Sequence, residues 1–182
     1  MEQNWSQDDY VRAYRFAAQA HLGQTVPGTD LPYIVHPSLV SMEVIAALIA
    51  EPGCDGNLAV QCALLHDVIE DTDVAFDQVE AAFGRAVAQG VLALSKDETL
   101  EKSRQMPDSL RRIQQQPREV WMVKLADRIS NLGPPPYYWT KEKIARYKVE
   151  ATEIHDALHS ASPFLAARLL DKIEAYKAYE RI

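Results

Sequence analysis

A histidine–aspartate doublet, His66-Asp67, ends an apolar stretch of the sequence, and the acidic pair Glu70-Asp71 follows one helical turn later. Four ionisable side chains directly after a run of alanine and leucine would be costly to bury unless something pairs with them. A metal ion is a partner that imidazoles and carboxylates can share. The doublet therefore predicts a metal site at the end of this stretch.

Two protein ligands are too few for tight binding, so the site needs others from elsewhere in the chain. His36 precedes a proline that suits the first turn of a helix, and Asp127 lies within a later helical segment. Two imidazoles and two carboxylates suit Mn²⁺, Fe²⁺ or Zn²⁺ better than Ca²⁺, and they leave positions open for water and substrate. His36 and Asp127 are the predicted additional ligands, although each could also be an ordinary loop residue or surface ion pair.

The elements that position these residues are predicted to be helices. Apolar residues recur at helical spacing along almost the whole chain, and no stretch alternates long enough to demand a sheet. The 182 residues, 47% of them hydrophobic, can bury one sizeable core. We expect an all-α fold, with residues 1–182 forming a single bundle of about eight to ten helices. The longest predicted helices span residues 6–21, 37–50, 56–70, 118–132, 141–159 and 163–179.

Within this bundle the His-Asp doublet falls near the end of the helix predicted for residues 56–70. Asp127 and Asn131 are four residues apart, so they share one face of their helix. The segment 95–116 is rich in charge and is interrupted by Met106-Pro107. It is predicted to be a mobile surface loop followed by a short helix, which could cover a pocket.

The composition excludes several classes of partner. Lysine and arginine total 19 against 26 acidic residues, and the net charge of −7 disfavours nucleic acid or an anionic membrane as a partner. Neither a signal peptide nor a membrane span is expected. Cys54 and Cys62 lack the close pairing of zinc or redox motifs, so free thiols and a cytoplasmic location are predicted. A homo-oligomer stays open.

Several ordered motifs resemble the HD-type phosphohydrolases. The likeness is strongest to the small alarmone hydrolases, stand-alone relatives of the hydrolase domain of RelA/SpoT proteins that include the metazoan SpoT homologue. The matching motifs are residues 20–24, 32–37, 64–72, 83–84 and 123–128. The resemblance implies an all-helical HD domain that uses Mn²⁺ to hydrolyse the stringent-response nucleotide (p)ppGpp. Pyrophosphate would be released from the ribose 3′ position.

The resemblance also implies roles for the ionisable residues. The family's metal ligands correspond to His36, His66, Asp67 and Asp127, the same set that residue chemistry favours. The family's Glu-Asp pair lies beside the metal's water. Glu70 is accordingly expected to orient that water or accept its proton, and Asp71 to assist proton transfer to the leaving group.

Residues for substrate binding are suggested less directly. Asn131 matches a substrate-contacting asparagine of the family, and Gln24 belongs to its first motif. Tyr33 could contact the ligand or simply pack. Lys143 and Arg146 belong to a basic stretch that could receive phosphate, although such a run is usually a solvated helix face.

Two further polar residues near the motifs have a simpler interpretation. Lys124 is read as a structural lysine whose stem packs near the site. His21 matches a family position, but a histidine at a helix end satisfied by local hydrogen bonds explains it equally well.

The sequence departs from the family after Gly23-Gln24. Thr25-Val26-Pro27 replaces the usual basic pair, and Pro134 stands where a threonine often occurs. The hydrolytic residues are kept while part of the nucleotide-recognition set has changed. Two alternatives therefore stay open: a phosphohydrolase of another nucleotide, such as a nucleoside monophosphate or NADPH, and a nucleotide-binding regulator without turnover.

Overall fold

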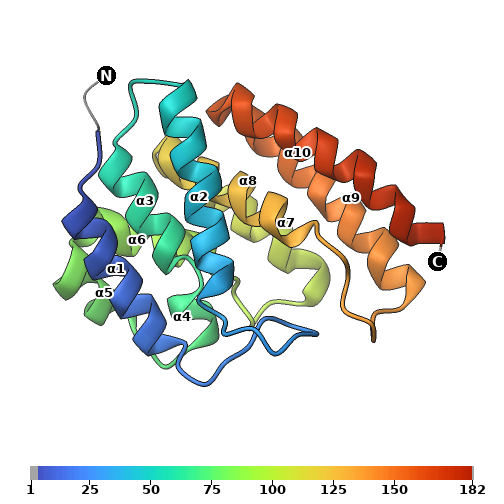
Figure 1. Cartoon of the computed structure of the whole chain (residues 1–182), viewed down its shortest axis with the longest axis horizontal. Helices are drawn as coiled ribbons and strands as arrows, with labels where there is room; N and C mark the ends of the chain where they lie inside the picture. Colours follow the sequence, from blue (N-terminus) through green and yellow to red (C-terminus); the bar gives the residue numbers. More distant parts are fainter. Residues whose placement is uncertain (1–3, 182) are drawn as a thin grey trace.

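The structure, a computed structural model, describes residues 4–181, in which ten α-helices and two 3₁₀ helices follow one another (Figure 1). No β-strand forms within this range, where an isolated bridge joins Thr25 and Pro32. The all-α prediction is confirmed. The α-helices are α1 (Gln7–Ala20), α2 (Val35–Ala50), α3 (Gly56–Leu65), α4 (Val68–Asp71), α5 (Phe76–Phe83), α6 (Arg85–Leu94), α7 (Lys102–Ile113), α8 (Arg118–Asn131), α9 (Lys141–Leu158) and α10 (Pro163–Tyr176), and the 3₁₀ helices are His159–Ala161 and Lys177–Arg181.

Polar caps set where several helices begin. The side chains of Ser6, Asp55, Thr140 and Ser162 each accept a hydrogen bond from a backbone N–H in the first turn of α1, α3, α9 and α10. Such a bond satisfies an N–H that has no partner inside the helix. Ser162 caps α10 directly before Pro163, which occupies the first turn of that helix.

Helices α2, α3 and α8 pack on one another at the centre of the molecule. Helix α1 lies against α3, while α9 and α10 cover α8 from the other side (Figure 1). Gly90 of α6 allows a close approach, because a Cβ there would lie 2.8 Å from the Cys62 sulfur and 2.9 Å from Val120. The centre is thus a helix triplet wrapped by the remaining helices, and α8 is buried along most of its length.

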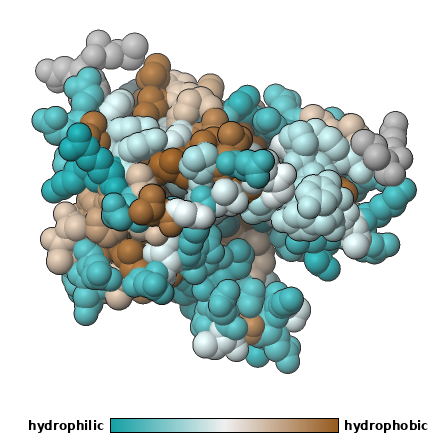
Figure 2. Space-filling model, turned by 60° about the horizontal axis from the view of Figure 1, so that its bottom comes forward, coloured by the Kyte–Doolittle hydropathy of each residue, from teal (hydrophilic) through white to brown (hydrophobic). Residues whose placement is uncertain are grey.

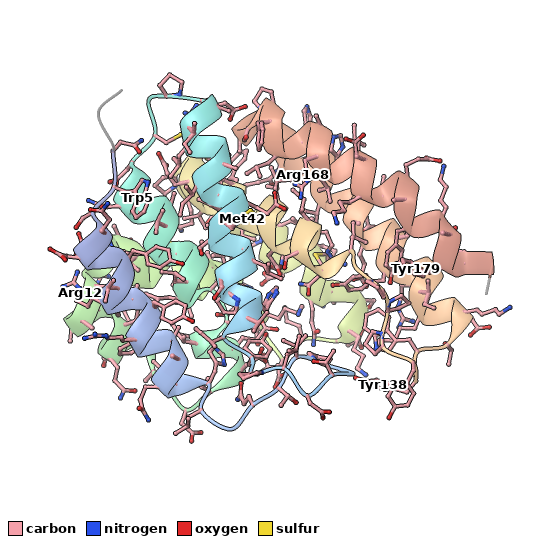
Figure 3. The ribbon with its side chains drawn as sticks, viewed as in Figure 1. Trp5, Arg12, Met42, Tyr138, Arg168 and Tyr179 are labelled. Atoms are coloured by element: carbon pink, nitrogen blue, oxygen red, sulfur yellow. The ribbon has the colours of Figure 1, made fainter. Side chains whose placement is uncertain are left out.

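A charged pair ties α10 to this centre. Glu43 of α2 is buried, and both of its carboxylate oxygens accept hydrogen bonds from the guanidinium of Arg168. Figure 3 shows Arg168 on the side of α10 that faces α2. A bidentate pair of this kind fixes orientation as well as distance.

One helix prediction was wrong at the most informative place. The helix predicted for residues 56–70 ends at Leu65, the chain turns at His66 and Asp67, and the single turn of α4 follows. Apolar spacing continues through Val68 and Ile69, so periodicity alone could not reveal the break. The break lets both members of the doublet face the same point.

The segment 95–116 contains a loop followed by a helix, as predicted, but the helix is longer than expected. Helix α7 occupies most of it and continues through Pro107. The proline removes one backbone hydrogen bond, but Met106, Ser109 and Ile113 bury one face of the helix, which lies against α6 and α9. Tertiary packing therefore outweighs the helix-breaking residue.

None of the helices in the described range is long and apolar enough to cross a membrane.

Candidate metal centre and active site

Four predicted ligands meet where α2 begins, α3 passes into α4, and α8 crosses. The Nε2 atoms of His36 and His66 lie 3.1 Å apart. His66 Nε2 is 2.9 Å from Asp67 Oδ2, and His36 Nε2 is 3.3 Å from Asp127 Oδ1. His36, His66 and Asp127 are buried, and Asp67 is half-buried. His36, His66 and Asp67 form a group that could hold a metal ion, with Asp127 beside it.

The outward nitrogens of the two imidazoles have partners that orient the rings. The Nδ1 atom of His66 lies 2.9 Å from the Ala63 carbonyl oxygen, which can only accept, so Nδ1 carries the hydrogen of this bond. The Nδ1 atom of His36 lies 3.4 Å from the Ser130 hydroxyl. Both rings thereby present Nε2 to the cluster, as metal-binding histidines commonly do. The donor set and its orientation fit a divalent cation.

The two carboxylates of the cluster favour an added positive charge, either a proton or a metal cation. Burial alone would lower the pKa of His66, but the carboxylates of Asp67 and Asp127 outweigh it and raise that pKa to about 9. Burial alone would raise the pKa of Asp67, yet the charges of His66 and His36 bring it below its usual range. Two carboxylates in a buried site thus favour protons or a metal cation between them.

Two other residues of α8 donate hydrogen bonds to the Asp127 carboxylate. The ammonium of Lys124 donates to Oδ2 at 3.0 Å, and the amide of Asn131 donates to Oδ1 at 2.6 Å. Although burial opposes it, the Lys124 charge and the nearby histidines lower the pKa of Asp127 well below its usual value. Lys124 is buried, as its interpretation as a structural lysine requires. Asn131, predicted to contact substrate, lies within the cluster through its bond to Asp127.

Tyr33 links the cluster to the second acidic pair. Its hydroxyl lies 2.6 Å from Asp67 Oδ2 and 3.2 Å from Asp71 Oδ2, so one proton is shared between two carboxylates. Burial and the nearby Asp67 charge raise the pKa of Tyr33, which therefore stays protonated and donates. Burial, Asp67 and Glu70 also raise the pKa of Asp71. Asp71 therefore binds a proton more readily than an ordinary aspartate does.

Glu70 has a partner that the sequence did not predict. Lys96 donates to it twice, from the backbone N–H to Oε2 and from the ammonium to Oε1, each at 2.8 Å. Each carboxylate oxygen has two lone pairs, so both oxygens keep one free acceptor position. Glu70 is therefore oriented but still able to accept a proton. A single lysine 26 residues away in a charged segment gives no signal from which this pairing could be predicted.

Gln24 lies at the edge of the same site. Its amide nitrogen donates to the Asp71 carbonyl at 2.7 Å, and its amide oxygen is 2.7 Å from His21 Nδ1. The buried His21 ring is 4.6 Å from the Tyr33 ring. The prediction of a ring satisfied by local hydrogen bonds thus holds for Nδ1 alone, because the buried Nε2 of His21 has no hydrogen-bond partner among the described residues. Gln24 and Tyr33 also line a pocket of about 480 Å³ together with Gly23, Thr25 and Asp71.

The two basic candidates of α9 lie away from this network. Lys143 is exposed and places its ammonium 4.2 Å from the centre of the Trp139 ring, and Arg146 is exposed as well. Among residues 4–181, no hydrogen bond or ion pair joins either side chain to the His-Asp cluster. The structure therefore does not bring them into the centre.

The segment that replaces the family's basic pair forms a small hairpin. The Thr25–Pro32 bridge closes it, and Gly28, with φ of +80°, meets the turn after α8, where a Cβ would lie 3.0 Å from Pro136. Figure 3 shows Tyr138 of that turn at the lower edge of the molecule. Two loops thus touch beside the site without a basic residue in the hairpin.

Figure 2 turns the end of the molecule that carries the start of α2 and the α3–α4 break towards the viewer. Its lower part is hydrophilic, whereas hydrophobic residues gather in patches above.

Comparisons with known proteins agree with this geometry. Residues 13–163 match the HD domain family. The chain is 30% identical to the guanosine-3′,5′-bis(diphosphate) 3′-pyrophosphohydrolase MESH1 of Xenopus tropicalis, over 87% of this chain and 89% of that protein. It is also 30% identical to the corresponding pyrophosphohydrolase of Aquifex aeolicus, over 83% of this chain but 21% of that protein.

A solved structure shows the same fold. It is that of a metazoan orthologue of SpoT, described as hydrolysing ppGpp and having a role in starvation responses. The two superpose with a TM-score of 0.81 at 27% identity, covering 94% of this chain and 97% of the other. The chain belongs to the HD-domain family of hydrolases, and its relatives within that family are the MESH1 and SpoT-type enzymes.

Proposed function

We propose that this chain is a metal-dependent pyrophosphohydrolase of (p)ppGpp-type nucleotides, with Mn²⁺ as its metal. The observation that carries the proposal is the convergence of His36, His66, Asp67 and Asp127 from three separate parts of the fold. The kinship with enzymes named for this reaction supports the choice of substrate.

The four clustered residues would hold the metal through two imidazole nitrogens and two carboxylates, a set that suits Mn²⁺. A bound cation would supply Lewis acidity and positive charge, which acidify water and neutralise phosphate oxygens. Four further residues would keep these ligands oriented. Ala63 and Ser130 contact the Nδ1 atoms of the two imidazoles, Lys124 donates to Asp127 Oδ2, and Asn131 donates to Asp127 Oδ1.

Glu70 would accept the proton of the attacking water through one of its free acceptor positions. The water oxygen forms a bond to the phosphorus attached to the ribose 3′ oxygen, and the bond between that phosphorus and the 3′ oxygen breaks. Pyrophosphate then leaves. Lys96 holds Glu70 by two bonds, which favours one orientation of its carboxylate during this transfer.

Asp71 would give the ribose 3′ oxygen its proton. The Tyr33 hydroxyl lies between Asp71 and Asp67, so it fixes the distance from the metal centre to this acid. Gln24 holds the backbone of Asp71 from the other side. The two acids of the Glu-Asp pair thereby take different partners and different roles.

Substrate recognition would use the pocket beside Gln24 and Tyr33, with Asn131 near the ribose or phosphate. Lys143 and Arg146 would add positive charge at the rim of this site. The uncharged hairpin that begins at Thr25 is the observation that keeps a second candidate open, hydrolysis of another nucleotide such as NADPH or a nucleoside monophosphate.

The remaining properties follow from the same proposal. Residues 1–182 would act as one HD domain, since a continuous hydrophobic cluster links α1 to the residues around Tyr176. Cys54 and Cys62 are free thiols within the described range, which favours a reducing compartment and thus a cytoplasmic location.

The test is to load purified protein with Mn²⁺ and incubate it with ppGpp, NADPH and nucleoside monophosphates, resolving products by ion-exchange chromatography. We expect GDP and pyrophosphate in equal amounts from ppGpp, and none after chelation of the metal. Turnover of a different nucleotide alone would select the second candidate. Binding of ppGpp without any product would instead make the protein a regulator.

A further inference from the structure

Arg112 of α7 connects the end of α6 to the Glu70 side of the site. Its guanidinium donates to the carbonyl oxygens of Leu92 and Ala93 at 2.8 and 3.1 Å, and to that of Ser95 at 2.7 Å. The next residue after Ser95 is Lys96, which donates two hydrogen bonds to the Glu70 carboxylate. One side chain thus fixes the backbone from which the partner of Glu70 extends.

Arg112 is itself held in place. Its Nε donates to Asp108 at 2.7 Å, and this bond together with that from Arg111 lowers the pKa of Asp108. The Ser95 hydroxyl donates to the Val91 carbonyl at 2.9 Å, which fixes the same turn from the helix side. A planar guanidinium with several donors in a fixed fork can hold three carbonyls at once, which a lysine ammonium cannot do with the same geometry.

The ion pair between Lys96 and Glu70 lies at the other end of this series of hydrogen bonds. The Lys96 side chain is 39% exposed, and although desolvation works against the charged form, the Glu70 carboxylate raises the Lys96 pKa. Lys96 therefore stays charged and bound to Glu70. A pocket of about 570 Å³ lies along this path, with Glu70, Lys96, Asp108 and Arg112 in its wall.

We propose that Arg112 is a positioning residue for hydrolysis, which holds the Ser95-Lys96 turn so that Lys96 presents the Glu70 carboxylate to the attacking water. This inference rests on the role proposed above for Glu70. Arg112 would act through Lys96, because its hydrogen-bond partners within residues 4–181 are Asp108 and the α6-end carbonyls and include none of the four predicted metal ligands. A purely structural cap at the end of α6 would stabilise the fold without any link to Glu70.

Arg111 provides a matched control. It is the neighbouring arginine, it pairs with the same Asp108 at 2.7 Å, and it is largely exposed, but it has no hydrogen bond to the α6 carbonyls within residues 4–181. Arg111→Ala removes the same charge from the same helix. Only Arg112→Ala should release the Ser95-Lys96 turn.

The first measurement uses Mn²⁺-loaded full-length protein and ppGpp. Arg112→Ala should lower kcat by about tenfold or more, with KM and bound Mn²⁺ nearly unchanged, because general-base catalysis depends on the geometry of the base. Arg111→Ala should stay within about twofold of the unmodified protein, as expected for an exposed charge. Adding Arg112→Ala to Glu70→Gln should cause no further loss, and independent losses that multiply would overturn the proposal.

A second measurement does not depend on activity. Hydrogen–deuterium exchange at the Lys96 amide should become about tenfold faster or more in Arg112→Ala but not in Arg111→Ala, since the amide loses its fixed place against Glu70. Unchanged exchange would overturn the proposal even if the enzyme is active. Absence of any nucleotide hydrolysis by the unmodified protein would instead reject the proposed function. If Arg112→Ala fails to fold, Asp108→Asn removes the anchor and should cause the same changes to a smaller degree.

Discussion

The His-Asp cluster (His36, His66, Asp67 and Asp127) lies beside a second region, the Glu70 side, which consists of Glu70, Lys96 and Arg112. The two regions are held together by different kinds of contact. Three of the four cluster residues are buried, and they come from α2, the α3–α4 break and α8, which pack on one another. Glu70 is held by Lys96, which lies in the loop after α6 and not in a helix. The first region is fixed by the core, and the second by a chain of hydrogen bonds.

The difference bears on how each region should respond to change. A ligand in the cluster shares its partners with the other ligands, so the loss of one leaves buried charge without compensation. The Glu70 side can adjust its conformation after a substitution, because the loop that carries Lys96 is exposed to solvent. Substitutions in the cluster should therefore be all-or-none, whereas those around Glu70 should give graded losses of rate.

The largest expected effect comes from Asp67→Ala. Removal of this carboxylate takes one ligand from the cluster and the acceptor of the Tyr33 hydroxyl. We expect bound Mn²⁺ to be lost on dialysis and hydrolysis to fall by roughly a thousandfold or more. Metal content by mass spectrometry and pyrophosphate release measure the two effects. Asp77→Ala, at an exposed acid in the first turn of α5, is the control and should change neither. Normal turnover by Asp67→Ala would reject the metal site.

Glu70→Gln should separate the two regions. The amide keeps the size of the side chain, and its single oxygen can accept one of the two Lys96 hydrogen bonds, but it cannot take a proton from water. We expect kcat to fall by about a hundredfold or more while bound Mn²⁺ stays near one per chain. Metal content and kcat are measured on the same preparation. Loss of Mn²⁺ from the variant would show that Glu70 is a metal ligand and belongs to the cluster, not that it accepts the water proton.

The cluster could be predicted from the sequence because histidine and aspartate side chains are metal ligands in their own right, whatever the details of the fold. A His-Asp doublet after an apolar run implies a charged partner, and His36 and Asp127 complete a known kind of ligand set. The structure brings all four together. What periodicity could not give was the break after Leu65, since Val68 and Ile69 continue the helical pattern and only the packing of α3 and α4 ends it.

The Glu70 side could not be predicted for a related reason. Lys96 and Arg112 lie in a charged stretch that was expected to be a loop with a short helix, whereas α7 runs through Pro107 because one of its faces is buried. Hydrogen bonds from Arg112 to backbone carbonyls depend on where α6 ends in space. No residue type or spacing in the sequence encodes that contact.

Tyr33→Phe tests the link between the two regions. The ring stays in contact with His21, but the hydroxyl that joins Asp67 to Asp71 is lost. We expect kcat to fall by about tenfold, with metal affinity lowered by a similar or smaller factor, as is usual for partners of metal ligands. Titration of the metal-free protein with Mn²⁺ and steady-state kinetics measure both. An unchanged kcat would mean that the Glu-Asp pair works independently of the cluster.

The smallest effect is expected from Lys143→Ala. The side chain is exposed and its ammonium lies over the Trp139 ring, so it can attract a phosphorylated substrate but cannot position the reacting atoms. We expect KM for ppGpp to rise by about twofold to threefold with kcat unchanged, and the rise to disappear at high salt, where exposed charges are screened. Lys141→Ala, also exposed and on the same turn of α9, is the control and should raise KM less. A large fall in kcat would instead place Lys143 within the hydrolytic site. It would contradict the distinction between a buried centre that is sensitive to substitution and exposed residues that are not.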